Sequence, residues 1–454
     1  MCYHRPIEIH SEEPVPDKCI LILLDGLGDR AYEELGGLTP LQAAATPNLD
    51  RLAAAGGNGL YHAAALGQAL PSENAHFAMF GFSPEEFPGR GALEALGGGV
   101  DLQPGEVALL VHLVGVHEES GTLILDRDLP EASAGEAEAL IAAVATYETG
   151  GVRIRFHRTK GLFGVLTLSG EVAPYVTDTN LMMERVPLPE VLPWQTHRED
   201  PAARNTARAL KEYLVWAHRR LQAHPVNAER AAQGRHPVNG LVTQRAGRLK
   251  NVPSFAERNG LRGLSLSSGI VYWGISRFLG LDLVQAKDSA APGADLAARL
   301  ELAREKLPDY DFVHVHTKAA DEAAHRKDPA AKKAVIEAFD EGIGRVLPDL
   351  LADPDLLLIV TADHSTPSGG PLIHSGEPVP LLLHGRGVRR DAVERYDEVA
   401  AAAGAVGCVR GREFMYLVLN HLERAKLAGI MDTPIDQPYW PGDFQPFRLE
   451  EPGQ

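Results

Sequence analysis

The sequence predicts an α/β protein interrupted by a second, smaller domain, and three observations lead to this fold class. Short apolar runs typical of buried parallel strands occur near the start and in the last third of the chain. The stretches between them have helix-forming composition. Between about 106 and 265, short strands punctuated by Asp, Glu, Gly and Pro replace this pattern. We therefore expect a discontinuous core at 18–105 and 266–430 around an inserted α+β domain at 106–265.

The first strand is expected at Cys19–Leu24, a continuous apolar run that ends at Asp25-Gly26. Thr46 then precedes a proline at the first position of a helix, and Gly56-Gly57 ends that helix. A strand followed by a helix is an α/β unit. We expect the residues outside the core, 1–17 and 431–454, to be irregular termini.

Later runs continue the same pattern. Asp311–His316, Leu356–Val360 and Val379–Leu383 have the same strand character and are separated by helical stretches rich in Ala, Glu and Lys. Within the insert we expect short strands at Val152–Phe156 and Gly164–Leu168. We also expect one long helix, rich in Ala and Arg, near 202–222.

Composition narrows the classes of partner. The chain has 454 residues, with 44 Lys and Arg against 61 Asp and Glu, for a formal net charge of −17. This balance argues against a nucleic acid or an anionic membrane as partner, because such binding depends on basic contacts to phosphates. A small phosphorylated substrate would need a local positive site, which bound divalent cations can supply.

Cysteine usage points to a reducing compartment. The three cysteines, Cys2, Cys19 and Cys408, contain no C-x-x-C pair, which excludes a disulfide framework and a cysteine zinc site. The N-terminus is charged and rich in proline, and no apolar span of about 18 residues follows. We predict a cytoplasmic protein.

Acids and histidines fall where the predicted strands end. Asp25 follows the first strand, Asp363-His364 follows the strand at 356–361, and Asp321 and His325 come shortly after the strand at 311–316. Carboxyl ends of parallel strands meet at one edge of a sheet, where open α/β folds bind their ligands. Asp321 and His325 are four residues apart, so one helical turn would point both the same way.

His374 lies ten residues after His364 and can return to the same edge. Any one of these residues alone could be an ordinary surface charge, but their repetition at strand ends favours a metal site. Carboxylates and imidazoles without thiolates suit Mn²⁺, Zn²⁺ or Mg²⁺, and phosphoryl transfer commonly uses two ions about 3.5–4 Å apart. The sequence predicts such a site.

Ser72 is the candidate nucleophile. It follows Pro71 in a turn from which a helix can start, and a helix N-terminus favours an alkoxide or a phosphoryl anion. A plain helix-capping role is the alternative. The nucleophile interpretation therefore depends on the metal site, in which one ion would lower the pKa of Ser72 and the other would bind phosphoryl oxygens.

Several ordered motifs resemble cofactor-independent phosphoglycerate mutase of the archaeal type, a group within the alkaline phosphatase superfamily. The resemblance extends from about residue 18 to 425. It is carried by Asp25-Gly26, Thr39–Leu52, Pro71-Ser72, Gly89–Gly97, Lys318–His325, Thr361–Ser365, His374–Pro380 and a tail segment from Tyr396 to Arg412.

The resemblance implies an alkaline-phosphatase-like core, with a mixed, mostly parallel sheet flanked by helices, and an inserted substrate domain. It implies two divalent ions, with Mn²⁺ as the first choice. The implied ligands are Asp25, Ser72, Asp363 and His364 for one ion, and Asp321, His325 and His374 for the other. Phosphate would pass from 2- or 3-phosphoglycerate to Ser72 and return to the neighbouring hydroxyl.

The resemblance also suggests substrate residues. Asp126 would be the general acid/base, and Arg127, Lys318 and Arg245 would contact the substrate. Each of these four could equally be an exposed charge.

Departures from the family pattern leave the substrate open. Where the family has Asp-Arg-Arg-Ala-Gly-Arg, this chain has Asp126–Glu131, and the family's Arg-Cys-Asn is replaced by Leu110–His112. The family's Thr-Asp-Thr-Asp-Pro corresponds to Thr177–Asn180, with Asn180 in place of the second Asp, and its Pro-Gly-Ser-Asp corresponds to Pro71–Asn74. Loss of guanidinium groups changes how a carboxylate or phosphate is held. A phosphomonoesterase, or a phosphonate or phosphodiester hydrolase, using the same nucleophile is therefore the alternative. A non-catalytic phosphate binder is disfavoured, since buried acids without ions would be costly.

Overall fold

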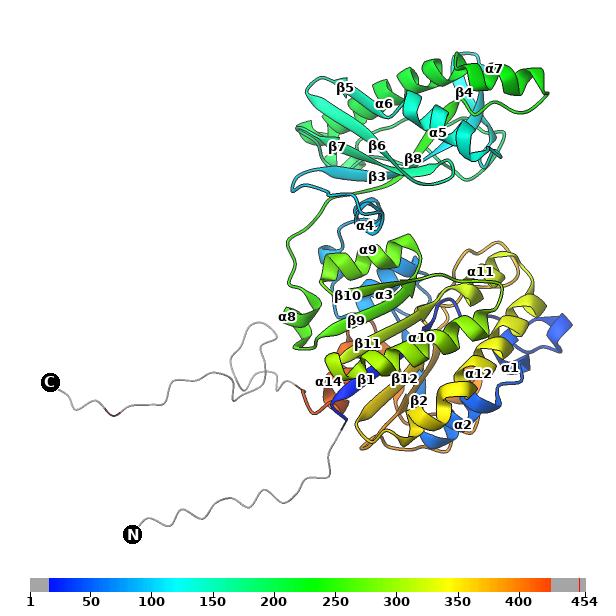
Figure 1. Ribbon diagram of the computed structural model, residues 1–454, viewed down its shortest axis with the longest axis vertical. Helices are drawn as coiled ribbons and strands as arrows, with labels where there is room; N and C mark the ends of the chain where they lie inside the picture. The colour runs from blue at the N-terminus through cyan, green and yellow to red at the C-terminus, as the bar shows by residue number, and fades with distance from the viewer. Residues whose placement is uncertain (1–15, 426–448, 450–454) are drawn as a thin grey trace, which may run out of the picture. The chain divides into compact units, whose positions relative to one another are not determined.

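A computed structural model describes residues 16–425 and 449 and divides the chain into two compact units (Figure 1). Within the described residues, the first unit comprises 16–85, 253–269 and 279–425, and the second comprises 86–252 and 270–278. The terminal segments predicted to be irregular lie almost entirely outside the described residues. The second unit starts earlier than the predicted insert at 106–265 and also includes most of one later helix.

An eight-stranded sheet forms the centre of the first unit, in the order β10-β9-β11-β1-β12-β13-β2-β14. Strands β1, β11, β12, β9 and β10 pair in parallel, as do β14 and β2, whereas β13 is antiparallel to both of its neighbours. The prediction of a mixed, mostly parallel sheet is confirmed. The strands are β1 (Lys18–Leu24), β2 (Gly57–His62), β9 (Gly263–Ser268), β10 (Asp282–Ala286), β11 (Phe312–Thr317), β12 (Leu356–Thr361), β13 (Val379–His384) and β14 (Gly407–Arg410).

Burial explains why β1 is a continuous apolar run. It lies between β11 and β12, and all residues from Cys19 to Leu24 are inaccessible to solvent. A strand covered on both faces has no polar side to alternate with. The similar run Val379–Leu383 also forms a strand, β13, but we expected it to be parallel and it is antiparallel. A continuous apolar run shows that a strand is buried on both faces but does not by itself fix the direction of the strand.

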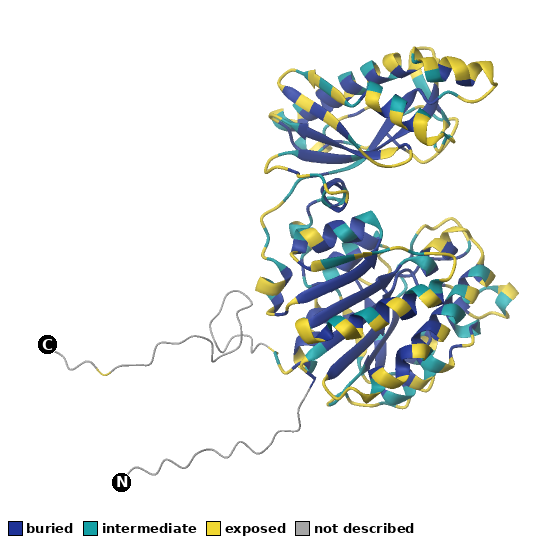
Figure 2. Cartoon of the chain, viewed as in Figure 1, coloured by how far each residue is buried: buried dark blue, intermediate teal, exposed yellow. Residues whose placement is uncertain are grey.

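Helices flank this sheet with their outer faces exposed (Figure 2). The predicted helix after Thr46 is α2, which starts at Pro47 and ends before Gly56. The helices of this unit are α1 (Pro40–Ala43), α2 (Pro47–Ala55), α3 (Ser72–Met79), α8 (Phe255–Asn259), α10 (Pro292–Lys306), α11 (Ala319–His325), α12 (Pro329–Ala352), α13 (Glu398–Ala401) and α14 (Glu413–His421).

The second unit is built on a six-stranded sheet, β4-β3-β7-β6-β5, with β8 also pairing β3, and all of its pairings are antiparallel. Its strands are β3 (Val107–Glu119), β4 (Thr122–Arg127), β5 (Thr146–Thr149), β6 (Val152–Lys160), β7 (Phe163–Ser169) and β8 (Gly240–Gly247). Its helices are α4 (Arg90–Gly97), α5 (Ala134–Ala143), α6 (Pro201–Gln222) and α7 (Pro225–Ala232). The long helix expected near 202–222 is α6.

Helix α9 (Ile270–Leu279) belongs almost wholly to the second unit because it packs tightly on α4. A Cβ added to Gly274 would lie 1.8 Å from the carbonyl oxygen of Leu93, and one added to Gly97 would lie 1.9 Å from that of Ile270. Two glycines thus allow the two helix backbones to touch.

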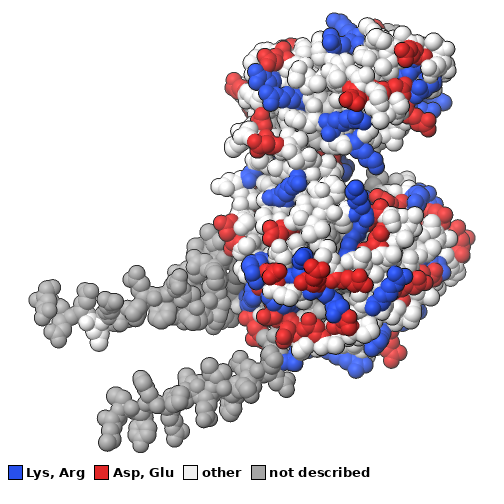
Figure 3. Space-filling model, viewed as in Figure 1, with Lys and Arg blue, Asp and Glu red and all other residues white. Residues whose placement is uncertain are grey.

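Acidic and basic side chains are interspersed on the face of the molecule in view (Figure 3). Among the described residues, no helix is both long enough and apolar enough to cross a membrane.

Candidate active site

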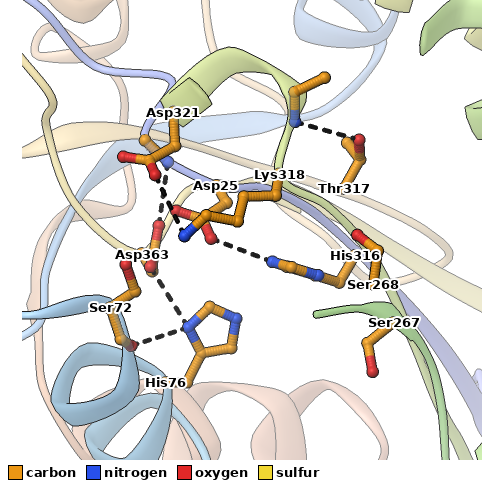
Figure 4. Close-up of polar contacts among 12 residues, drawn as sticks. Asp25, Ser72, His76, Ser267, Ser268, His316, Thr317, Lys318, Asp321 and Asp363 are labelled. Atoms are coloured by element: carbon orange, nitrogen blue, oxygen red, sulfur yellow. Dashed lines mark hydrogen bonds and ion pairs between the residues drawn. The ribbon is translucent and has the colours of Figure 1, made fainter. Parts of the chain in front are cut away.

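Three buried carboxylates meet at the carboxyl edge of the first unit's sheet (Figure 4). Asp25 follows β1 directly, Asp363 follows the neighbouring β12, and Asp321 lies in α11 just after β11, the other neighbour of β1. Each is at most 1% exposed. The central position of β1 brings together side chains that are about 300 residues apart in the chain.

With three histidines, these acids form two groups that could each hold a metal ion. The first group is Asp25, Asp363 and His364, and the second is Asp321, His325 and His374. Within each group the candidate ligand atoms lie within 4.8 Å of one another. The rings of His364 and His374 stack with centroids 3.8 Å apart, so the two groups adjoin.

Each histidine reaches its group by a different route. His325 ends α11, one turn after Asp321, and its Nε2 lies 3.2 Å from Asp321 Oδ1. His374 lies in the loop between β12 and β13, and its Nδ1 donates to the carbonyl oxygen of Leu70 at 2.8 Å. That contact turns His374 Nε2 toward Asp321 Oδ1, 3.6 Å away.

Ser72 lies beside the first group. It is the first residue of α3, after Pro71, and is 5% exposed. Its Oγ is 2.8 Å from His364 Nε2. The hydroxyl therefore combines a helix N-terminus with a direct contact to a candidate metal ligand.

Two buried histidines behind the first group were missed by the sequence analysis (Figure 4). His76 Nδ1 donates to the carbonyl oxygen of Ser72 at 3.0 Å and lies 3.2 Å from Asp363 Oδ2. His316 Nε2 lies 3.1 Å from Asp25 Oδ2. The available signals were the spacing of four residues from Ser72 to His76, and two histidines, His314 and His316, that alternate with Val313 and Val315 in the buried strand β11.

Lys318 is a basic residue at this edge, and its Nζ lies 3.2 Å from Asp321 Oδ2. Burial alone would lower its pKa, but the carboxylates of Asp25, Asp321 and Asp363 raise the pKa above the usual value. Lys318 therefore stays charged near neutral pH.

The carboxylates and His364 shift each other's protonation. Burial would raise the pKa of Asp363, but His364 and His76 hold that pKa well below its usual range. Burial would likewise lower the pKa of His364, and the carboxylates of Asp363, Asp25 and Asp321 instead raise it to about 9. The edge thus concentrates negative charge that attracts cations.

This donor set fits divalent ions. It offers carboxylate oxygens and imidazole nitrogens in two adjacent groups, which is the ligand chemistry of Mn²⁺, Zn²⁺ and Mg²⁺. The buried acids also need positive charge beyond that of Lys318.

The remaining predicted residues lie in the second unit. Asp126, on β4, is 2.7 Å from His117 Nδ1, and the neighbouring Arg127 is 3.6 Å from Glu184. Arg245, on β8, has a φ of +54° and its backbone N–H donates to Asp178.

His112, which has an unassigned role, is buried in the second unit. Its Nε2 is 3.0 Å from Asp128 Oδ1, its ring stacks on Phe163, and Asn180 donates to the same Asp128 oxygen at 3.1 Å. His112, Asp128 and Asn180, which lie in three segments that depart from the family pattern, therefore form one hydrogen-bonded cluster.

The mixed sheet with two carboxylate–histidine groups at its edge defines a metal-dependent enzyme, and residues 17–421 match the Metalloenzyme superfamily. The 2,3-bisphosphoglycerate-independent phosphoglycerate mutase 2 of Methanocaldococcus jannaschii is 39% identical over 95% of this chain and 100% of its own length. The chain belongs to the family of 2,3-bisphosphoglycerate-independent phosphoglycerate mutases, as the motifs indicated.

Solved structures agree with this assignment. A Pyrococcus horikoshii protein aligns with a TM-score of 0.76 at 30% identity, over 91% of this chain and 100% of its own. The cofactor-independent phosphoglycerate mutase of Thermoplasma acidophilum aligns with a TM-score of 0.63 at 30% identity, over 89% of this chain and 99% of its own.

Proposed function

We propose that this protein interconverts 2- and 3-phosphoglycerate without 2,3-bisphosphoglycerate, by passing the phosphoryl group through Ser72. Family membership supports the reaction. The role of Ser72 is supported by its position at the start of α3 and by the distance of 2.8 Å between its Oγ and His364 Nε2. A phosphoryl group on this oxygen would lie at a helix N-terminus beside both acid–histidine groups.

The proposed ion ligands follow the two groups. One ion would be held by Asp25, Asp363 and His364 together with Ser72, and the other by Asp321, His325 and His374. Mn²⁺ is our first choice, with Zn²⁺ and Mg²⁺ as alternatives. Such ions, when bound, lower the pKa of an attacking hydroxyl and neutralise phosphoryl oxygens.

The chain's own residues complete the proposed mechanism. His76 fixes the backbone of Ser72 and the carboxylate of Asp363, so the nucleophile and a ligand share one support. The Lys318 ammonium, beside Asp321, would bind a substrate anion. By family resemblance, Asp126 would move the proton of a substrate hydroxyl, and Arg127 and Arg245 would bind the substrate.

We also place the enzyme in the cytoplasm. The two cysteines among the described residues, Cys19 and Cys408, are both free thiols, which supports a reducing compartment.

The test is a phosphorus NMR time course with 3-phosphoglycerate and Mn²⁺ that follows 2-phosphoglycerate and free phosphate together. Formation of 2-phosphoglycerate without phosphate release is the expected result. Release of phosphate would identify a hydrolase instead. Ser72→Ala should abolish either reaction. Ser276→Ala removes a buried hydroxyl that donates to the carbonyl of Tyr272, outside the site, and should leave the rate unchanged.

A further inference from the structure

Thr366 is a fully buried residue that contacts both acid–histidine groups and was assigned no role by the sequence analysis. It lies three residues after Asp363, in the loop between β12 and β13. Its Oγ1 is 2.9 Å from Asp321 Oδ1, in one group, and 3.1 Å from His364 Nδ1, in the other. A single hydroxyl therefore bridges ligands proposed for different ions.

The direction of these two hydrogen bonds follows from chemistry. The Asp321 carboxylate is an acceptor, so the Thr366 hydroxyl donates its only proton to it. The same oxygen must then accept the Nδ1–H of His364. This arrangement leaves the lone pair of His364 on Nε2, the nitrogen that faces Ser72 and the first group. The tautomer needed for an Nε2 ligand is thus selected by Thr366.

We propose that Thr366 is a positioning residue that couples the two metal sites by orienting one ligand of each. This inference rests on the proposed ligand sets and goes beyond them. With an ion bound at the first site, His364 Nε2 would be a ligand, and His364 would hold its Nδ1–H on Thr366 so that the hydroxyl proton stays directed at Asp321. Occupancy of one site would then prepare the ligand of the other, and uptake of the two ions would be cooperative.

The surroundings hold Thr366 rigidly enough for this role. Its N–H donates to the carbonyl of Gly28 at 2.9 Å, and its own carbonyl accepts from Lys332 Nζ at 2.9 Å. Lys332 is fully buried and also donates to Gly28 and to Asp29. On the other side, a Cβ added to Gly26 would lie 2.7 Å from Thr366 Oγ1, so this backbone closes over the hydroxyl.

If Thr366 had only a structural role, its removal would have a different effect. Any buried hydroxyl needs hydrogen-bond partners, and removing one lowers stability wherever it lies. Only a positioning role changes the affinity for ions at both sites. Thr361 provides the matched control, because it is equally buried, ends β12 in the same segment, and donates to the carbonyl of Pro380.

The experiment is calorimetric titration of metal-free protein with Mn²⁺ for wild type, Thr366→Val, Thr366→Ser and Thr361→Val, with circular dichroism to verify folding. Thr366→Val should lose about 10- to 100-fold in affinity at both sites, the range for losing an outer-shell partner, and its two ions should bind independently. Thr366→Ser should restore affinity and cooperativity. Thr361→Val should bind ions as wild type does.

If Thr366→Val binds two ions with wild-type affinity, the proposed coupling is wrong, whereas the proposed function is unaffected. Loss of affinity at one site only, with unchanged binding at the other, also overturns it. If the wild-type protein binds no second ion, both the proposed ligand sets and the proposed coupling are wrong. Should Thr366→Val not fold, Thr366→Ala removes the same hydroxyl without adding a methyl group, and the same outcomes apply.

Discussion

The two acid–histidine groups differ in how deeply they are enclosed. All three members of the first group, Asp25, Asp363 and His364, are buried, whereas the second group combines buried Asp321 with partly exposed His374 and exposed His325. The first group has the nucleophile candidate on one side and two histidines behind it. The second is open to solvent and adjoins Lys318.

This difference suggests a division of labour. A closed, well-supported group would keep an ion in fixed geometry beside Ser72, and an open group could exchange ligands with a substrate. If the inner group, Asp25, Asp363 and His364, holds its ion more tightly than the outer group, loss of a ligand should have different effects at the two groups.

The largest contrast is expected between Asp363→Asn and His325→Ala. The first change should lower the rate of phosphoryl transfer about 10³-fold, since an ion contributes several kcal/mol to the transition state. The second should weaken binding chiefly of the ion at the second, outer group (Asp321, His325 and His374), and excess Mn²⁺ should restore much of the rate. The measurement is rate against Mn²⁺ concentration. Equal rescue of both variants would contradict the proposed difference.

Metal removal should destabilise the protein. An ion that binds only the folded state, at 100 times its dissociation constant, contributes about 2.7 kcal/mol. A chelator should therefore lower the melting temperature. Scanning calorimetry at increasing chelator concentrations measures this, and an unchanged melting temperature at full chelation would argue against both sites.

His76→Ala should weaken the inner site by about 10- to 100-fold, because His76 supports Asp363 and the backbone of Ser72. Affinity at the outer site should fall less, and only through its coupling to the inner site. Competition of Mn²⁺ with a chromophoric chelator resolves the two affinities. His218→Ala is the control, since His218 binds the carbonyl of Asn239 in the second unit. A loss that is equal at both sites would show that His76 supports the whole edge.

The smallest effect concerns pH. In metal-free protein the pKa of His364 is raised from 6.5 to about 9, so its charged form stabilises the fold below about pH 6.5 and this contribution is lost as the pH rises to about 9. A metal ion needs the neutral ring, so metal affinity should increase by up to about tenfold per pH unit within that window. The gap in melting temperature with and without Mn²⁺ should widen with pH; a constant gap would exclude His364 as the titrating ligand.

Much of the candidate site could be predicted from the sequence, because its candidate ligands follow strand ends and strands such as Cys19–Leu24 are recognisable from their apolar composition. The spacing from Asp321 to His325 gave one helical turn, as observed in α11. His76, His316 and Thr366 were not predicted, since their roles arise from contacts between segments 45 to 291 residues apart. The direction of β13 was inaccessible for the same reason.

The place of β1 in the sheet has a consequence for synthesis of the protein. Among the described strands, β1 is synthesised first, and its partners β11 and β12 follow about 300 residues later. Contacts of such high sequence separation form late, because a long loop must close before they stabilise anything. The second unit is nearly continuous in sequence and can fold while the ribosome is still translating the rest. The nascent N-terminal segment therefore carries Asp25 and Ser72 before the other proposed ligands have been synthesised, and both proposed metal sites can be complete only after translation has passed His374, between β12 and β13.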